Sequence, residues 1–241
     1  MSGLPLVVVT GAGSGIGAAV ARRFSAAGHP LLLIGRREAA LEALDLPQSI
    51  CAALDVGDAA AAQDAVHLAE QRYGAADCLV NSAGVMRLAD AAGQDAAEFA
   101  EMLNTNVVGS VNLIQCVLPG MLRQRRGTVF NVSSIAGRQA FPMHAGYCAS
   151  KFAVHGYTAA LGLDMAAHNI RVSTVSPGVV ETPLLRSTTS APARAMFEQW
   201  LDTLDSLLAP EDVAGIIAFA YQLPQNVCMR EIFVTSTSQG S

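Results

Sequence analysis

Lysine is almost absent from this chain: Lys151 is the only one among 15 cationic side chains. Charged residues make up only 15% of the 241 residues, and the formal net charge is −5. The arginines occur as isolated pairs, such as Arg22-Arg23 and Arg125-Arg126, and they do not form a basic stripe. We therefore expect neither nucleic acid nor an anionic membrane surface as a partner.

Cysteines are few and scattered as well. The five of them form no CxxC pair, and the histidines and carboxylates show no metal-ligand spacing. This pattern indicates reduced thiols that act as small apolar residues, and it predicts no metal site. No apolar run reaches the ~18 residues of a membrane span, and the first apolar run follows no basic signal-peptide region. We therefore expect a cytoplasmic protein without a membrane partner.

Short apolar runs alternate with longer amphipathic or alanine-rich stretches. The runs predict strands at residues 6–9, 31–34, 78–80, 128–132, 172–175 and 231–234, with a further strand near 50–54. Because these runs are nearly continuous in Val, Ile and Leu, the strands should be buried on both faces, as in a parallel sheet. The stretches between them predict helices at residues 15–27, 38–44, 59–73, 98–126, 146–168 and 210–221.

Strand and helix alternation of this kind predicts an α/β Rossmann fold, a doubly wound and mostly parallel sheet of seven strands with helices on both faces. No linker or internal repeat divides the chain, so we expect residues 1–241 to form a single catalytic domain. The segment 183–209 breaks the rhythm, and we expect it to be an excursion that contacts the substrate.

A glycine-rich turn, TGAGSGIG, follows the first strand and opens the first helix, with glycines at 11, 13, 15 and 17. Small residues at such a turn let the backbone approach a pyrophosphate, which the helix N-terminus attracts. The turn therefore favours nucleotide binding, and a purely structural turn stays open as the alternative.

The end of the second strand carries Arg36 and Arg37, where an acidic side chain would bind the ribose hydroxyls of NAD. Arginine has a planar fork of donors that suits a 2′-phosphate. We therefore expect NADP(H) as the cofactor, with a solvated helix start as the alternative role of the pair.

The only lysine lies four residues after Tyr147, in the stretch YCASK. On a helix, Tyr147 and Lys151 share one face. An ammonium beside a phenol lowers the pKa of that phenol from its usual value near 10, which would make Tyr147 a general acid and base. A buried tyrosine beside a lysine whose stem follows the surface is the structural alternative.

Together these stretches resemble the short-chain dehydrogenase/reductase (SDR) family, and the resemblance runs from Thr10 to Thr182 in the family's order and spacing. The turn resembles the family's TGxxxGxG. LDV at 54–56 and NSAG at 81–84 resemble its adenine-contacting and NNAG segments, although Ser82 replaces the usual second Asn. FNVSSIAG, NTNVVGS and SPGVVET resemble further family motifs.

The resemblance implies a catalytic set and a cofactor-binding set. The catalytic residues would be Asn106, Ser134, Tyr147 and Lys151. The cofactor would be bound by Thr10, Gly11, Gly15, Ile16, Gly17, Arg36, Arg37, Asp55, Val56, Asn81, Ala83, Gly84, Tyr147, Lys151, Pro177, Gly178, Val180 and Thr182. Whether His144, Phe197 and Trp200 line the substrate pocket stays open.

The function implied is an NADP(H)-dependent oxidoreductase that interconverts a carbonyl and a secondary alcohol of a small molecule. The C-terminal stretch is most similar to the branch of NADP-dependent 3-hydroxy acid or serine dehydrogenases, which makes 3-hydroxy acids candidate substrates. The first alternative is a 3-oxoacyl thioester reductase that acts on an acyl-carrier protein. The second is a non-catalytic NADP(H)-sensing regulator. The family also implies a homodimer or homotetramer packed through the fourth and fifth crossover helices.

Overall fold

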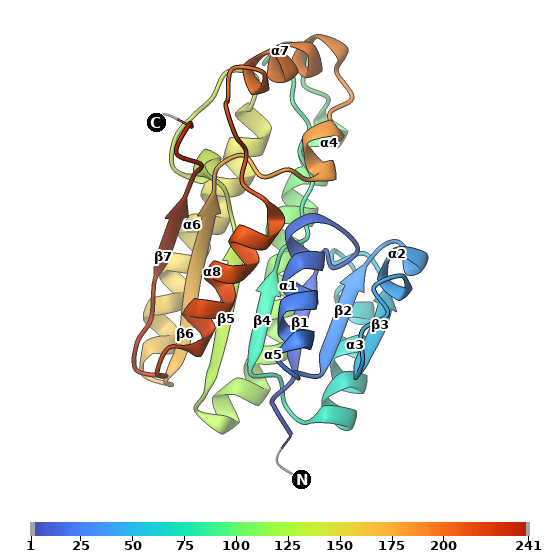
Figure 1. The fold of residues 1–241 in the computed structure, drawn as a ribbon, viewed down its shortest axis with the longest axis vertical. Helices are drawn as coiled ribbons and strands as arrows, with labels where there is room; N and C mark the ends of the chain where they lie inside the picture. Colours follow the sequence, from blue (N-terminus) through green and yellow to red (C-terminus); the bar gives the residue numbers. More distant parts are fainter. Residues whose placement is uncertain (1–2, 240–241) are drawn as a thin grey trace.

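The computed structural model describes residues 3–239. Seven strands form one sheet in the order β3-β2-β1-β4-β5-β6-β7, and all neighbouring strands are parallel (Figure 1). The predicted doubly wound Rossmann-type sheet is confirmed. The strands are β1 (Val7–Thr10), β2 (Leu31–Gly35), β3 (Ser49–Ala53), β4 (Cys78–Asn81), β5 (Gly127–Val132), β6 (Ile170–Pro177) and β7 (Glu231–Val234).

The chain starts in the middle of the sheet, continues outward to β3 and then returns to place β4 beside β1. This reversal of winding direction leaves a crevice at the carboxyl ends of the central strands, where open α/β sheets bind their ligands.

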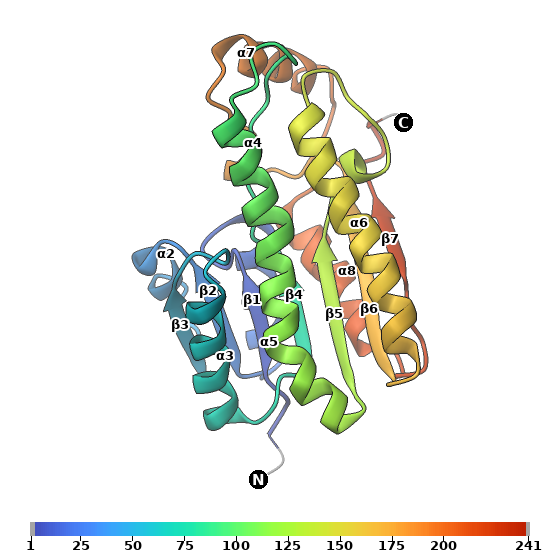
Figure 2. The same ribbon diagram turned by 180° about the vertical axis from the view of Figure 1, so that it is seen from behind.

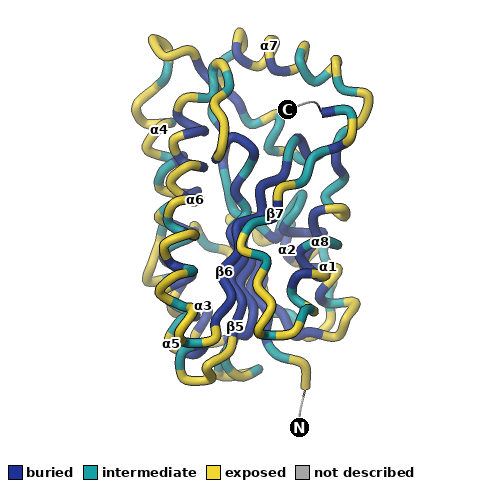
Figure 3. The backbone as a smooth tube through the Cα atoms, turned by 90° about the vertical axis from the view of Figure 1, so that its left-hand side faces the viewer, coloured by how far each residue is buried: buried dark blue, intermediate teal, exposed yellow. Residues whose placement is uncertain are grey.

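Helices cover both faces of the sheet. On one face lie α1 (Gly15–Ala26) and α8 (Pro210–Gln222), as Figure 1 shows, and on the other lie α3 (Ala59–Tyr73), α5 (Gly109–Gln124) and α6 (Ala145–Ala166), as Figure 2 shows. The sheet is buried between these two layers (Figure 3). The short helix α2 (Glu38–Glu42) follows β2 directly.

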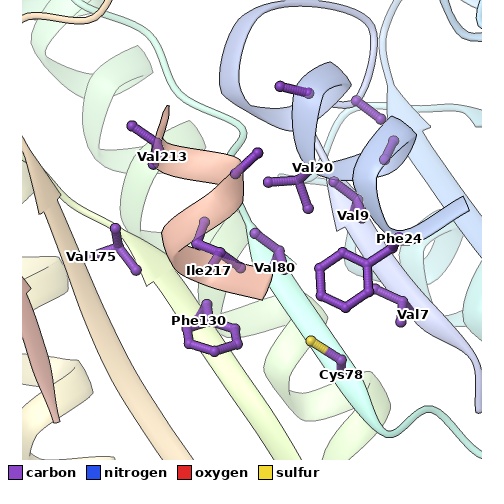
Figure 4. Close-up of a cluster of buried hydrophobic side chains, with 14 of the residues drawn as sticks. Val7, Val9, Val20, Phe24, Cys78, Val80, Phe130, Val175, Val213 and Ile217 are labelled. Carbon is purple, nitrogen blue, oxygen red and sulfur yellow. The ribbon is translucent and has the colours of Figure 1, made fainter. Parts of the chain in front are cut away.

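Alternation along β1 divides the core between the two layers, because successive side chains of a strand point to opposite faces. Val7 and Val9 pack with Phe24 of α1 and Ile217 of α8 (Figure 4). Val8 packs on the other face in a second cluster that includes residues of α3 and α5. Both faces are therefore apolar, as the near-continuous Val and Leu runs predict.

The predicted helix at 98–126 is interrupted. It consists of α4 (Ala96–Leu103), a π-helical turn (Asn104–Val108) and α5. The stretch Ala96–Gln124 is long and apolar enough to cross a membrane by length and composition, and 56% of its apolar window is buried inside the fold. Its position on the sheet explains that apolar character as core packing.

The excursion at 183–209 contains a 3₁₀ turn (Pro183–Arg186) and helix α7 (Ala191–Leu201). It lies beyond the carboxyl ends of the strands, with α7 farthest from the sheet (Figures 1 and 3). A bridge between Val180 and Leu208 ties its return segment to the chain just after β6. A second 3₁₀ turn (Ile135–Gly137) follows β5.

Candidate active site

A cavity of about 720 Å³ opens at the carboxyl ends of the strands. Its walls come from the turn after β1, the segments after β4, β5 and β6, helix α6 and the excursion. Segments far apart in the sequence thus meet at one edge of the sheet, as the fold requires.

The glycine turn is needed for close backbone packing. Gly11 has φ +65°, and a Cβ there would lie 2.9 Å from the backbone of Ala83. A Cβ at Gly17 would lie 2.4 Å from the Gly11 carbonyl oxygen, so this glycine serves packing and does not line the cavity. Gly11, Gly15 and Ile16 do line it.

Helix α1 presents an uncapped N-terminus to this cavity. Its N-cap residue, Ser14, makes no side-chain capping hydrogen bond, and its first turn contains no acidic residue. By contrast, Asp58 caps α3 and Asp95 caps α4. Free N–H groups and the positive end of the helix dipole suit an anion such as the pyrophosphate of a dinucleotide. The turn therefore fits the cofactor that the sequence predicts.

Both arginines after β2 line the cavity at the end near the glycine turn. The Arg36 side chain is 60% exposed and lies 4.0 Å from the Glu101 carboxylate. Arg37 is the N-cap residue of α2. Neither guanidinium is held in a close ion pair, so both can turn toward a phosphate.

Some residues at the ends of the strands and in the segments after β3 and β4 line a cavity, and others hold the backbone in place. Asp55, Val56, Ala83 and Gly84 line a smaller adjoining cavity. Thr10 and Asn81 lie behind it: the Thr10 hydroxyl accepts from the N–H groups of Ser82 and Ala83 at 3.0 Å, and the Asn81 amide donates to Asn131 Oδ1 at 2.9 Å. The Thr10 side chain thus holds the turn after β4, the Asn81 side chain connects β4 to β5, and neither lines the two cavities.

Tyr147 and Lys151 lie together on α6, as their spacing predicts. Their relative exposures are 6% and 5%. The Lys151 ammonium lies 5.7 Å from the centroid of the Tyr147 ring and donates to the Val132 carbonyl at 2.9 Å. Both side chains line the cavity.

The direction expected for the Tyr147 pKa is wrong in this structure. Burial raises the pKa of Tyr147 to about 12, and hydrogen bonding to Ser134 offsets that rise only in part. Burial also lowers the pKa of Lys151 to about 8. Desolvation disfavours the charged form of both groups, and it is the largest cause of both pKa shifts.

Ser134 also lines the cavity, at the carboxyl end of β5. Its hydroxyl accepts from the Ala136 N–H at 3.1 Å, which starts the 3₁₀ turn after the strand. Its neighbour Ser133 also lines the cavity, but its hydroxyl donates to the Lys151 carbonyl at 3.1 Å. Of the two adjacent serines, Ser134 therefore matches the role that the family implies.

Asn106 lies in the π-helical turn and does not line the cavity. Its Oδ1 accepts from Val85 N–H at 2.8 Å, and its Nδ2 donates to the Val85 carbonyl at 3.0 Å and to Ser150 Oγ at 2.9 Å. Val85 in turn lines the cavity. The structure thus makes Asn106 the residue that holds the segment after β4, and the sequence reasoning missed its partner Ser150.

The segment after β6 brings Pro177, Gly178, Val180 and Thr182 to the cavity wall, as expected. A residue that sequence reasoning missed holds this segment: Gln239 Oε1 accepts from Val179 N–H at 2.9 Å. Gln239 follows the last strand by several residues, and no motif marks it. His144, Phe197 and Trp200, whose placement the sequence left open, all line the cavity.

The fold and the position of the cavity are those of the doubly wound α/β class, which includes the dinucleotide-binding enzymes. The family model described as short chain dehydrogenase matches residues 5–193. The chain belongs to this family and is an oxidoreductase that acts on alcohol and carbonyl groups.

Individual relatives agree with this assignment. Sulfoacetaldehyde reductase 2 from Chromohalobacter salexigens is 36% identical over 97% of this chain and 95% of its own length. The glycine betaine reductase ATRR of Emericella nidulans is 37% identical over 95% of this chain, which spans only 18% of that larger protein. The closed form of serine dehydrogenase complexed with NADP+ superposes with a TM-score of 0.90 at 28% identity, over 98% of this chain and 96% of that one.

Proposed function

We propose that this protein is an NADP(H)-dependent oxidoreductase that interconverts a carbonyl and a secondary alcohol, with Tyr147 as the general acid and base. The observation that carries the proposal is the buried pair of Tyr147 and Lys151 in the wall of a cavity that also contains Ser134 and an uncapped helix N-terminus. The cofactor would supply or accept the hydride.

The protonation states of this pair suit carbonyl reduction. With a pKa of about 12, Tyr147 carries its proton at neutral pH and can donate it to a carbonyl oxygen. With a pKa of about 8, Lys151 exchanges its proton near neutral pH and can replenish the tyrosine. Ser134 can hold the substrate oxygen by a hydrogen bond. Alcohol oxidation runs the same transfers in reverse.

NADP(H) is favoured by Arg36 and Arg37, whose guanidinium groups lie at the nucleotide end of the cavity without a close carboxylate partner. The NADP+ complex of the similar serine dehydrogenase supports the same cofactor. The names of the relatives span serine and sulfoacetaldehyde, so they do not select a substrate for this chain.

The two alternatives make different demands on the molecule. A cofactor-sensing regulator needs no buried Tyr–Lys pair, so the pair supports an enzyme. A reductase of acyl-carrier-protein thioesters needs a basic surface for its acidic partner, and a net charge of −5 does not favour one. We therefore rank a small-molecule carbonyl compound first.

We also propose that the chain acts as one catalytic domain in the cytoplasm, with free cysteines, and that it forms a homodimer or homotetramer through α5 and α6. These two helices lie side by side on one face of the sheet (Figure 2). That region exposes large apolar side chains, including Val108, Phe152 and Leu163. Such residues gather at subunit interfaces.

The deciding experiment follows absorbance at 340 nm with NADPH and with NADH across a panel of ketones, aldehydes, hydroxy acids and acyl thioesters. We expect turnover with NADPH and a lower KM for NADPH than for NADH. Tight NADPH binding without turnover of any compound would instead assign the protein to the sensing class.

A further inference from the structure

Five apolar side chains line the part of the cavity next to Tyr147, beside Ser134 and His144. They are Val85, Phe141, Leu184, Phe197 and Trp200, and we call this part of the cavity the substrate chamber. These side chains belong to one hydrophobic cluster that also includes Tyr147 itself. Because a carbonyl compound must lie against Tyr147 to receive its proton, the rest of the substrate has to occupy this chamber.

No acidic side chain lines the cavity among residues 3–239, and only four cationic ones do: Arg36, Arg37, Arg87 and Lys151. Arg36 and Arg37 lie at the nucleotide end, beside Asp55 and Gly13. Lys151 also lines the cavity, and its ammonium donates to the Val132 carbonyl and lies 5.7 Å from the centroid of the Tyr147 ring. Arg87 is the one cation of these four that lies outside both the nucleotide end and the Tyr147–Lys151 pair.

Arg87 is already engaged by other residues. It donates to both carboxylate oxygens of Glu101, from Nε at 3.0 Å and from Nη2 at 3.1 Å. Its Nη1 donates to the Ser187 carbonyl, at the end of the 3₁₀ turn in the excursion. A bidentate ion pair offsets the charge of the guanidinium and fixes its geometry. Arg87 therefore connects the excursion to Glu101, and its donors Nε, Nη1 and Nη2 are all engaged within the protein.

His144 adds no charge either. Its Nδ1 lies 2.7 Å from the Pro142 carbonyl, so Nδ1 carries the proton and donates it. The ring stands edge-on to Phe197, with centroids 5.8 Å apart. Burial lowers the pKa of His144, which keeps the imidazole neutral at pH 7 and above.

We propose that the substrate chamber selects uncharged ketones and secondary alcohols and rejects their carboxylated analogues, 3-hydroxy acids included. The proposal rests on the proposed function for the position of the reacting carbon. A carboxylate in this chamber would lose its water and find no cation to replace it, which is costly. A neutral ester of the same shape would gain apolar contacts and lose nothing.

The test compares methyl 3-oxobutanoate with 3-oxobutanoate, which share the ketone and differ by one charge. With NADPH at pH 7.5, we expect kcat/KM to be at least ~100-fold higher for the ester, the size of discrimination that an unpaired buried group produces. Equal or better turnover of the free acid would overturn the proposal.

A second readout does not depend on turnover. Trp200 is the only tryptophan in the chain, and it lines the chamber. Its fluorescence therefore reports occupancy of the chamber in the protein saturated with NADP+. We expect the ester to quench it at a concentration at least ~10-fold lower than the acid does. If neither compound is reduced but only the ester quenches Trp200 fluorescence, the proposed function is wrong and the preference of the chamber for uncharged ligands is supported. Quenching by the acid alone, by both compounds equally, or by neither contradicts the proposed preference for uncharged ligands.

A cation introduced into the cavity should improve turnover of the carboxylated substrate, which gives a third test. Met196 lines the cavity and is 39% exposed, so a longer polar side chain there can be solvated and should not disturb the fold. We expect Met196→Arg to raise kcat/KM for 3-oxobutanoate relative to its methyl ester by about 10-fold or more. Met196→Gln is the matched neutral control and should leave the ratio unchanged. An unchanged ratio in the Arg variant would count against charge as the basis of selection.

Discussion

Among residues 3–239 the buried Lys151 ammonium has no carboxylate partner, and its hydrogen bond goes to the Val132 carbonyl at 2.9 Å. The pKa of Lys151 is consequently lowered by burial to about 8. A buried ammonium held by one neutral acceptor destabilises the fold whenever it is protonated. The residue on which the proposed chemistry depends should therefore weaken the protein that contains it.

Replacement of this lysine by an apolar side chain of similar length should stabilise the protein at neutral pH. The folded-state pKa of Lys151 is lower than its unfolded value, so the unfolded chain binds more protons between about pH 8 and pH 10.5. The destabilisation is complete below pH 8 and disappears as the pH rises toward 10.5. The advantage of Lys151→Met over the wild type should then shrink by about 2 to 3 kcal/mol between pH 7 and pH 10.

Urea unfolding of both proteins at the two pH values measures this difference. Arg22→Met, which removes an exposed cation on α1, is the control, and its effect should not depend on pH. A constant difference between Lys151→Met and the wild type across this range would show that Lys151 is not destabilised by burial.

Substitution of Lys151 by arginine tests whether charge alone is sufficient. A guanidinium stays protonated at all relevant pH values and is broader than an ammonium. The Lys151 side chain is buried and its Nζ lies 2.9 Å from the Val132 carbonyl, so a broader head group cannot take the same position without moving its neighbours. We expect kcat of Lys151→Arg to fall by roughly 10²-fold or more in the 340 nm assay. A near-normal kcat would contradict both a role of Lys151 in proton exchange and the claim that a guanidinium is too broad for this site.

Removal of the Tyr147 hydroxyl should separate chemistry from binding. Tyr147→Phe keeps the buried ring but has no proton to donate, so kcat should drop by roughly 10²- to 10⁴-fold. The Kd for NADPH, measured by fluorescence titration, should change only a few-fold. Tyr157→Phe on the same helix is the matched control, since Tyr157 does not line the cavity. Equal losses in the two variants would refute a catalytic role for Tyr147.

The preference for NADP(H) is expected to depend on the arginine pair after β2. Arg36→Asp should raise KM for NADPH by about 10-fold and lower KM for NADH, because it replaces a phosphate-binding cation by a group suited to ribose hydroxyls. Rising salt concentration should weaken the binding of NADPH more than that of NADH, because salt screens the exposed guanidinium groups. Arg22→Asp makes the same charge change away from the cavity, and it should leave both KM values unaffected.

Most of the fold was predictable because buried parallel strands have a distinctive composition. The runs at residues 6–9 and 31–34 lie in β1 and β2, each within one residue of the observed bounds. The strand predicted at 172–175 is longer in the structure, because β6 starts at Ile170, directly after Asn169 turns the chain with φ +59°. The interruption of the long helix at Asn104–Val108 was not predictable, since a π-helical turn depends on tertiary hydrogen bonds such as those of Asn106.

The residues of the candidate site were likewise predictable only in part. Residues whose backbone must lie close to another segment, such as Gly11, are marked in the sequence by their type. Side chains that act through partners distant in the chain are not. Gln239 bonds Val179 across 60 positions, and Arg87 bonds Ser187 across 100, and neither pair follows from spacing. The pKa of Tyr147 also depends on burial, which composition does not measure residue by residue.

Substitution of Asn106 tests whether this residue positions Val85 or takes part in proton transfer. All its side-chain hydrogen bonds in the structure go to Val85 and Ser150, so Asn106→Ala leaves a buried N–H and carbonyl of Val85 without partners. We expect a loss of about 3 kcal/mol in the free energy of unfolding, together with a raised KM, because Val85 lines the cavity. Asn104→Ala removes an exposed amide from the same turn and should change stability by less than about 0.5 kcal/mol. If Asn106 only positions Val85, the pH at which kcat is half-maximal should be the same in Asn106→Ala and the wild type. A displaced pH profile with unchanged stability would instead assign Asn106 to the proton path.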